Sequence, residues 1–166
     1  MTLDEKLNKL YSMLQNQEKN ISKLQNKYEY GIKREAVNTT KQLQAFHQIQ
    51  NLLDDKETPD LHGWSISADF GLKLINLIKN KYYNLIIEYG SGSSTYLELK
   101  SIEKFWVQKN NKKKPPFLLI YEHNIEYLEE TKSILPKNIY TKYNFELRKL
   151  KDWQDQTGNY KYYSGS

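Results

Sequence analysis

The chain has 166 residues, a formal net charge of +5 and no cysteine, and 38% of its residues are hydrophobic. The lack of cysteine excludes disulfides, thiolate metal sites and cysteine nucleophiles. Acidic and basic residues are mixed through most of the chain, which does not favour nucleic-acid binding despite the positive net charge. The first residues lack a basic region followed by an apolar stretch, and the longest apolar runs are only as long as a strand. The sequence therefore predicts a cytoplasmic protein with no membrane partner.

Residues 3–53 carry an apolar stripe with the spacing of a coiled coil. Its members recur at alternating steps of three and four residues, namely Leu3, Leu7, Leu10, Leu14, Ile21, Leu24 and Tyr28, with the polar Gln17 at the one gap. A second stripe starts at Ile32, displaced by about one residue. The pattern predicts an oligomerisation helix over residues 1–56 that pairs with other copies of the chain. The alternative is an amphipathic helix that folds back on the rest of the chain, with a break near Gly31.

The remaining residues, 57–166, alternate between helical and strand patterns. Pro59 disfavours helix in the break at 54–60, and Ser67 is a candidate N-cap for the apolar helix that follows it. Further elements are predicted as strands at 84–89, 117–122 and 139–150 and as helices at 94–108 and 124–136. This order predicts an α/β domain with a parallel sheet and right-handed crossovers.

Glycines follow the first predicted strand, in the stretch "IIEYGSGSSTYLELK" (86–100). Gly90 and Gly92 stand between the carboxyl end of a strand and the start of a helix, where free N–H groups favour an anion or a polar ligand. The alternative is a glycine-rich turn without a ligand. Thr95 occupies the place of the third glycine of the dinucleotide pattern, and the Gly-Lys pair of a phosphate loop is missing. Glu122 ends the next strand, and a carboxylate there can accept hydrogen bonds from both hydroxyls of a ribose.

These two motifs resemble those of class I S-adenosylmethionine-dependent methyltransferases. A first motif of the form acid-x-Gly-x-Gly-x-Ser-Thr is matched by Glu88, Gly90, Ser91, Gly92, Ser94 and Thr95, and a second by Glu122, His123, Asn124 and Tyr127. The resemblance implies a Rossmann-like sheet with flanking helices that binds S-adenosylmethionine. By that resemblance, Glu88, Gly90 and Gly92 border the methionine part, Glu122 holds the ribose and His123 lies beside the adenine. It covers roughly residues 60–163, the N-terminal half of such a domain, without the acidic motif of its fourth strand.

The sequence identifies neither a catalytic residue nor the acceptor, which can be a small molecule or a glycan. His47, His62 and His123 lack the spacing of metal ligands, so we predict no metal site and interpret them as structural or surface residues. The basic loop 109–116 is interpreted as a solvated connection, and Trp64 either lines the cofactor site or caps the sheet edge. The predicted function is a methyltransferase, of which this chain holds the cofactor-binding half and an oligomerisation helix. The alternative is a catalytically silent coiled-coil scaffold with a degenerate methyltransferase-like domain.

Overall fold

A computed structural model describes residues 2–54, 58–59, 61, 66–108, 114–155 and 157–164. The chain divides into two compact units, Met1–Lys41 and Gln42–Ser166. None of the helices in the described ranges combines the length and the apolar character needed to cross a lipid bilayer.

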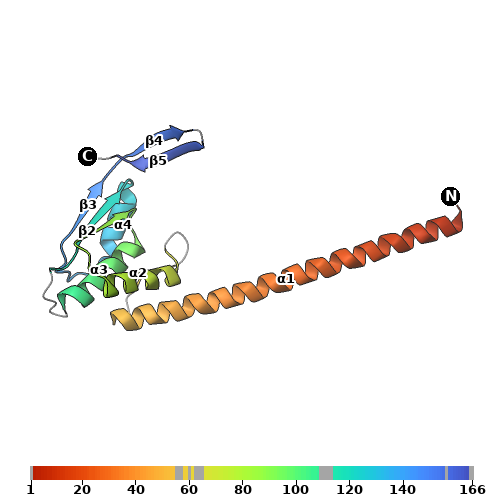
Figure 1. Cartoon of the computed structure of the whole chain (residues 1–166), viewed down its shortest axis with the longest axis horizontal. Helices are drawn as coiled ribbons and strands as arrows, with labels where there is room; N and C mark the ends of the chain where they lie inside the picture. Colours follow the sequence, from red (N-terminus) through yellow and green to blue (C-terminus); the bar gives the residue numbers. More distant parts are fainter. Residues whose placement is uncertain are drawn as a thin grey trace. The chain divides into compact units, whose positions relative to one another are not determined.

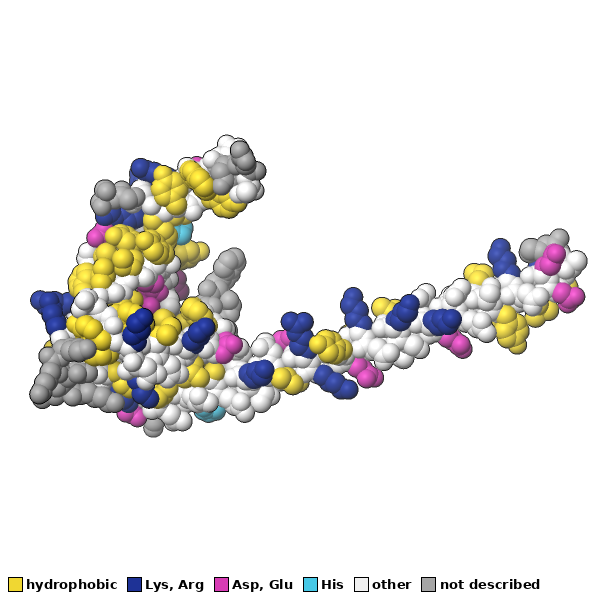
Figure 2. All heavy atoms as spheres, viewed as in Figure 1, with side chains coloured by type: hydrophobic (Ala, Val, Ile, Leu, Met, Phe, Trp, Pro, Cys, Tyr) yellow, Lys and Arg dark blue, Asp and Glu magenta, His cyan; other side chains and the backbone are white. Residues whose placement is uncertain are grey.

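The first element is one long helix, α1 (Leu3–Leu53), as the apolar stripe predicts. The helix runs through Gly31 without a break, so the suggested break at this glycine is wrong. In the first unit the stripe side chains are exposed; Leu7, for example, is 49% exposed and Leu14 52%. Figure 2 shows hydrophobic side chains spaced along this helix between charged ones. The apolar surface of residues 3–41 is therefore open to a partner.

The last turns of α1 belong to the second unit and help to build its core. Ala45, Ile49 and Leu53 are buried together with residues of α2 (Ala68–Asn80). A Cβ at Gly71 would lie 2.8 Å from Leu97 Cδ1 and 3.3 Å from Ile49 Cδ1. The glycine thus leaves room for side chains from two neighbouring helices to pack against the backbone of α2.

Ser67 occupies the N-cap position of α2, as expected, but its side chain does not cap a backbone N–H. Its hydroxyl instead donates to Asp69 Oδ1 at 2.6 Å, and Asp69 Oδ1 accepts the N–H of Phe70 at 2.9 Å. The N–H of Asp69 donates to Gln42 Oε1 at 3.2 Å. Side chains from α1 and from the first turn of α2 therefore satisfy donors that a helix start leaves unpaired.

Three parallel strands follow in the order β1-β2-β3: β1 (Leu85–Tyr89), β2 (Phe117–Glu122) and β3 (Tyr143–Leu147). Helix α3 (Ser93–Ile102), extended by a π-helical turn η1 (Glu103–Val107), connects β1 to β2, and α4 (Ile125–Ile134) connects β2 to β3 (Figure 1). The predicted α/β fold with a parallel sheet is confirmed at this level. Since both crossovers advance in one direction, right-handed connections place α3 and α4 on the same face of the sheet.

The two faces of the sheet differ in burial. Leu118 and Ile120 of β2 are fully buried against the helices. The side chains that alternate with them point to the other face, where β1 exposes Leu85, Ile87 and Tyr89 by 47%, 44% and 66%. Among the described strands β1 also pairs on one side only. The sheet therefore presents an apolar face and an unpaired apolar edge.

The third strand is shorter than the predicted 139–150, and this prediction is wrong at both ends. The N–H groups of Tyr140 and Thr141 each donate to Glu103 Oε2 at 3.1 Å, which takes this segment out of the strand ladder. β3 ends at Leu147, level with the last residue of β2, Glu122. The chain then forms an antiparallel hairpin of β4 (Leu150–Asp155) and β5 (Gly158–Tyr163).

Candidate ligand site at the strand ends

The glycine loop after β1 needs its glycines for backbone conformation. Gly90 has φ +91° and Gly92 has φ +156° with ψ −143°, and side-chain-bearing residues rarely adopt either conformation. A Cβ at either position would meet no atom within 4 Å. The loop thus has a backbone conformation that favours glycine at both positions, and open space lies beside it.

Glu88 ties the end of β1 to the start of α3. Its Oε1 accepts a short hydrogen bond from the Ser94 hydroxyl, and its Oε2 accepts the Thr95 hydroxyl at 2.6 Å. Thr95 Oγ1 in turn accepts the N–H of Gly92 at 3.1 Å. Four of the predicted site residues therefore form one connected network that fixes the loop against the strand.

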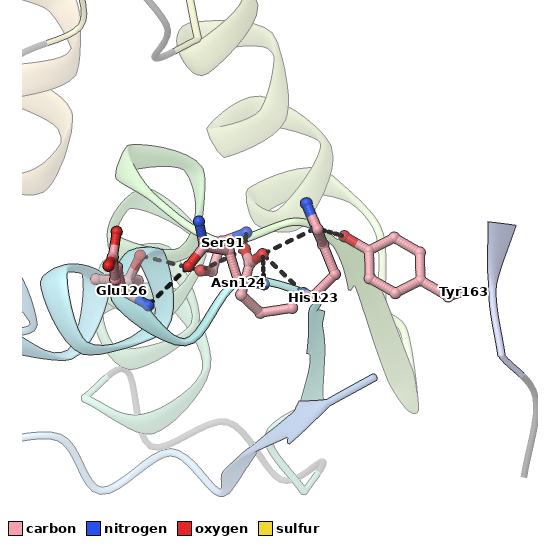
Figure 3. Close-up of polar contacts among 7 residues, drawn as sticks. Ser91, His123, Asn124, Glu126 and Tyr163 are labelled. Carbon is pink, nitrogen blue, oxygen red and sulfur yellow. Dashed lines mark hydrogen bonds and ion pairs between the residues drawn. The ribbon is translucent and has the colours of Figure 1, made fainter. Parts of the chain in front are cut away.

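Glu122, at the end of β2, is 2% exposed and accepts four hydrogen bonds. Its Oε2 accepts the N–H and the hydroxyl of Ser91 at 2.7 and 2.8 Å. Its Oε1 accepts the N–H groups of His123 and Asn124 at 2.7 and 3.0 Å. Figure 3 shows this meeting of the glycine loop with the start of α4. These hydrogen bonds connect the C-terminal ends of β1 and β2, which is the edge at which open α/β sheets bind their ligands.

The carboxyl groups near this edge differ in their pKa values. Burial alone would raise the pKa of Glu122, but the hydrogen bonds from Asn124, Ser91 and His123 hold it below its ordinary value. Burial raises the pKa of Glu88 to about 7, although the Ser94 and Thr95 hydroxyls oppose the shift. The negative charge of Glu122 adds to the rise in the Glu88 pKa. The site therefore holds a firmly ionised carboxylate on β2 beside a carboxyl on β1 that titrates near neutral pH.

A cavity of about 480 Å³ adjoins the glycine loop. Ser91, Gly92, Ser93 and Ser94 line it from the loop, and Tyr127, Glu130, Thr131 and Ile134 line it from α4. Thr131 is buried, and its hydroxyl donates to Ser91 Oγ at 3.1 Å. This volume lies within the range of pockets that take small organic ligands.

Tyr163 reaches the same edge from the C-terminal hairpin, and the sequence patterns do not single it out. Its hydroxyl lies 3.3 Å from His123 Nδ1, which is itself 3.1 Å from Glu122 Oε1 (Figure 3). Burial and the negative charge of Glu122 raise the pKa of Tyr163. The only sequence signal is a tyrosine at the end of a strand, in a chain with fourteen tyrosines.

The predicted site residues fall into two groups that meet at this edge. Glu88 contacts Ser94 and Thr95, while Glu122 contacts Ser91 and His123. His47 lies exposed on α1, away from these contacts. His62, Trp64 and residues 109–113 of the basic loop lie outside the described residues. Within the described ranges, no group of three or more His, Asp or Glu side chains has an arrangement suited to a metal ion.

Comparisons of the chain with protein families, with curated proteins and with solved structures give no match.

Proposed function

We propose that this chain is the cofactor-binding half of an S-adenosylmethionine-dependent methyltransferase. One observation carries the proposal: the Glu122 carboxylate, at the end of β2, accepts hydrogen bonds from the N–H and the hydroxyl of Ser91 in the glycine loop that follows β1. The cavity beside the same loop offers room for part of a nucleoside-sized ligand. The resemblance of the two motifs to class I methyltransferases is what selects the cofactor.

In this proposal the carboxylate of Glu122 holds the ribose. All four of its acceptor positions are occupied by donors of the chain, so a ribose hydroxyl has to replace one of them. The Ser91 hydroxyl is the donor that can leave, since it is a side-chain group that can rotate away, whereas the other three donors are backbone N–H groups. The three N–H donors stay in place and keep the carboxylate ionised.

The sheet supports the idea of a partial Rossmann-like domain. Its order, β1-β2-β3, corresponds to one half of a doubly wound sheet, in which the first strand is internal. Parallel sheets occur almost only with both faces covered, whereas here β1 exposes Leu85, Ile87 and Tyr89. A further strand beside β1 and a helix over this face would complete the domain, and the acceptor site would lie there.

Calorimetric titration with S-adenosylhomocysteine and S-adenosylmethionine tests the proposal. Binding of either ligand supports it, and Glu122→Gln should weaken binding by roughly tenfold or more, because the amide turns one acceptor into a donor. Glu129→Gln is the matched control, since Glu129 is exposed and pairs with Lys132 on the surface of α4. The proposal fails if neither ligand binds the parent chain at millimolar concentration.

A catalytically silent scaffold is the second candidate function, and the state of Glu122 favours it. The carboxylate is already saturated by four donors from the chain, which is the pattern of a structural cap that ties β2 to the glycine loop. Under this alternative no adenosyl ligand binds, and Glu122→Gln lowers the thermal stability of the chain. The same titrations therefore separate the two candidates.

We also propose that the chain forms a homo-oligomer through residues 3–41 of α1; the rest of the predicted stretch to residue 53 contributes Ile49 and Leu53 to the core of the second unit and is not available as a seam. The helix α1 is continuous, and the stripe members in its first unit are exposed, so the apolar seam is available for a second copy of the same helix. A helix with this polar remaining surface gains its stability mainly by burying such a stripe.

A further inference from the structure

Tyr163 lies where the C-terminal hairpin meets the carboxyl ends of β1 and β2. It pairs with Leu150 at the base of the hairpin, and the N–H of Ser164 donates to the carbonyl oxygen of Lys149 at 3.1 Å. Its ring centre lies 5.5 Å from that of Tyr89 and 6.4 Å from that of Tyr121. Tyr89 and Tyr121 are themselves stacked at 5.5 Å with an angle of 24° between the rings. These three rings form what we call the aromatic wall.

The aromatic wall stands next to the carboxylate to which we assign the ribose. The Tyr163 hydroxyl lies 3.3 Å from His123 Nδ1, and the His123 ring meets the Tyr163 ring edge-on, with centres 5.9 Å apart. The backbone N–H of His123 donates to Glu122. A ligand with its ribose on Glu122 would thus have its base within reach of Tyr163 and His123.

Aromatic surface remains open on this wall. Within the wall, Tyr89 is 66% exposed. The neighbouring His123 side chain is 42% exposed. Exposed aromatic rings beside a hydrogen-bonding carboxylate suit a ligand with a planar base and a polyol, because bases stack on aromatic faces and every base has such a face.

We propose that Tyr163 contacts the ligand, and that the aromatic wall stacks with the planar base of a nucleoside whose ribose Glu122 holds. This inference rests on the function proposed above and adds the hairpin to the binding site. The hairpin then serves to deliver one aromatic ring to the strand ends, and Tyr163 of β5 is part of the cofactor-binding surface.

Adenosine and S-adenosylhomocysteine are the probes for the test, titrated into the full chain by calorimetry. Tyr163→Leu keeps an apolar side chain on Tyr89 and Tyr121 but removes the ring, and it should weaken the binding of both ligands by roughly tenfold or more. Tyr163→Phe keeps the ring and should bind within roughly threefold of the parent. Tyr162→Leu is the matched control: Tyr162 is the adjacent residue, 48% exposed, and points to the other face of the hairpin.

The outcomes separate this inference from the proposed function. If the parent binds but Tyr163→Leu and Tyr162→Leu bind equally well, Tyr163 is not a ligand contact and only this inference falls. If the parent binds neither probe, the proposed function falls and this inference falls with it. Should Tyr163→Leu fail to fold, ring-proton resonances in the parent decide: adenosine must shift those of Tyr163 and leave those of Tyr162 in place.

Discussion

At the scale of single residues, the buried glutamates of the second unit differ in their hydrogen bonding. Glu122 and Glu103 each collect several hydrogen bonds from backbone and hydroxyl donors and connect segments far apart in the sequence. Glu98 of α3 is as deeply buried, at 5% exposed, but its Oε2 has no hydrogen-bond partner. Burial and the nearby charge of Glu88 raise the pKa of Glu98 to about 9. Glu98 is therefore a neutral acid in the core at pH 7.

This state of Glu98 predicts a pH-dependent gain in stability for Glu98→Gln. Between the ordinary pKa of 4.5 and about 9, the folded protein keeps a proton that the unfolded chain releases, so the parent loses stability as the pH rises. The glutamine variant avoids this loss. Its free energy of unfolding should equal that of the parent near pH 4.5 and exceed it by about 1–3 kcal/mol at pH 7, with a larger difference at pH 9.

Urea unfolding of parent and variant at pH 5, 7 and 9 measures the gap. Glu88, whose pKa is about 7, contributes a loss of the same sign to both proteins, and its charge also raises the pKa of Glu98, which adds to the difference above pH 7. A gap that is constant across this range would show that Glu98 is not a buried neutral acid. Glu122 acts in the opposite direction: its lowered pKa stabilises the fold above about pH 4.5, and that contribution disappears in more acidic solution.

At the scale of the elements, two glycines in helices occupy contrasting surroundings. Gly31 lies in the exposed middle of α1, and a Cβ there would meet nothing within 4 Å. Gly71 lies in α2, where a Cβ would come within 2.8 Å of the buried Leu97. The same substitution should therefore have opposite effects at the two positions.

Gly31→Ala is expected to stabilise α1 by about 0.5–1 kcal/mol, because alanine loses less backbone entropy in a helix. Gly71→Ala gains the same propensity, but Leu97 has to shift within a packed core, so we expect a net loss of about 1 kcal/mol. Thermal unfolding followed by circular dichroism measures both changes. Equal gains at the two sites would mean that the packing of α2 on its neighbours is loose enough to take the extra methyl group.

The elements also show how far sequence patterns reach. β2 lies where its short apolar run predicts it, because the run is bounded by Pro116 and by the polar residues after Glu122. The meeting of the glycine loop with Glu122 follows from the rule that parallel strands end at one edge. The start of β3 could not be predicted, because Glu103, almost forty residues earlier, takes the N–H groups of Tyr140 and Thr141.

The arrival of Tyr163 at the site is a second feature beyond sequence patterns. Its position depends on the end of β3 at Leu147, on the register of the β4–β5 hairpin and on a close approach to Tyr89 and Tyr121. Each of these is a tertiary relation that leaves no periodic trace in the chain. The burial of Glu98 is of the same kind, since a glutamate in a helix is ordinarily interpreted as an exposed residue.

At the scale of the whole molecule, the chain combines a globular unit with a long helix that has too little buried surface of its own. The fully buried side chains, such as Ile49, Ile75 and Leu97, all belong to the second unit. In the first unit, Leu7, Leu10 and Leu14 remain exposed by 49–62%. At about 0.8 kcal/mol for each buried CH₂ group, several such leucines on two helices can outweigh the entropy lost on association. Self-association is therefore the expected state of α1.

Replacing Leu14 and Ile21 together with lysine should convert the assembly to a monomer, because both side chains lie at the centre of the stripe and each helix would bury two ammonium groups in the seam. Light scattering gives the mass, to be compared with 19.8 kDa for one chain.

The double variant Ser12→Lys with Asn26→Lys is the matched control, since it adds the same charge at exposed positions opposite the stripe and should leave the oligomer intact. The globular unit should stay folded in both variants, as judged by the fluorescence of Trp106, which is buried and donates its indole N–H to Ile78. If the parent chain already has the mass of a monomer at tens of micromolar, the stripe does not pair with a second copy. The exposed leucines of α1 would then need a partner of another sequence to bury them.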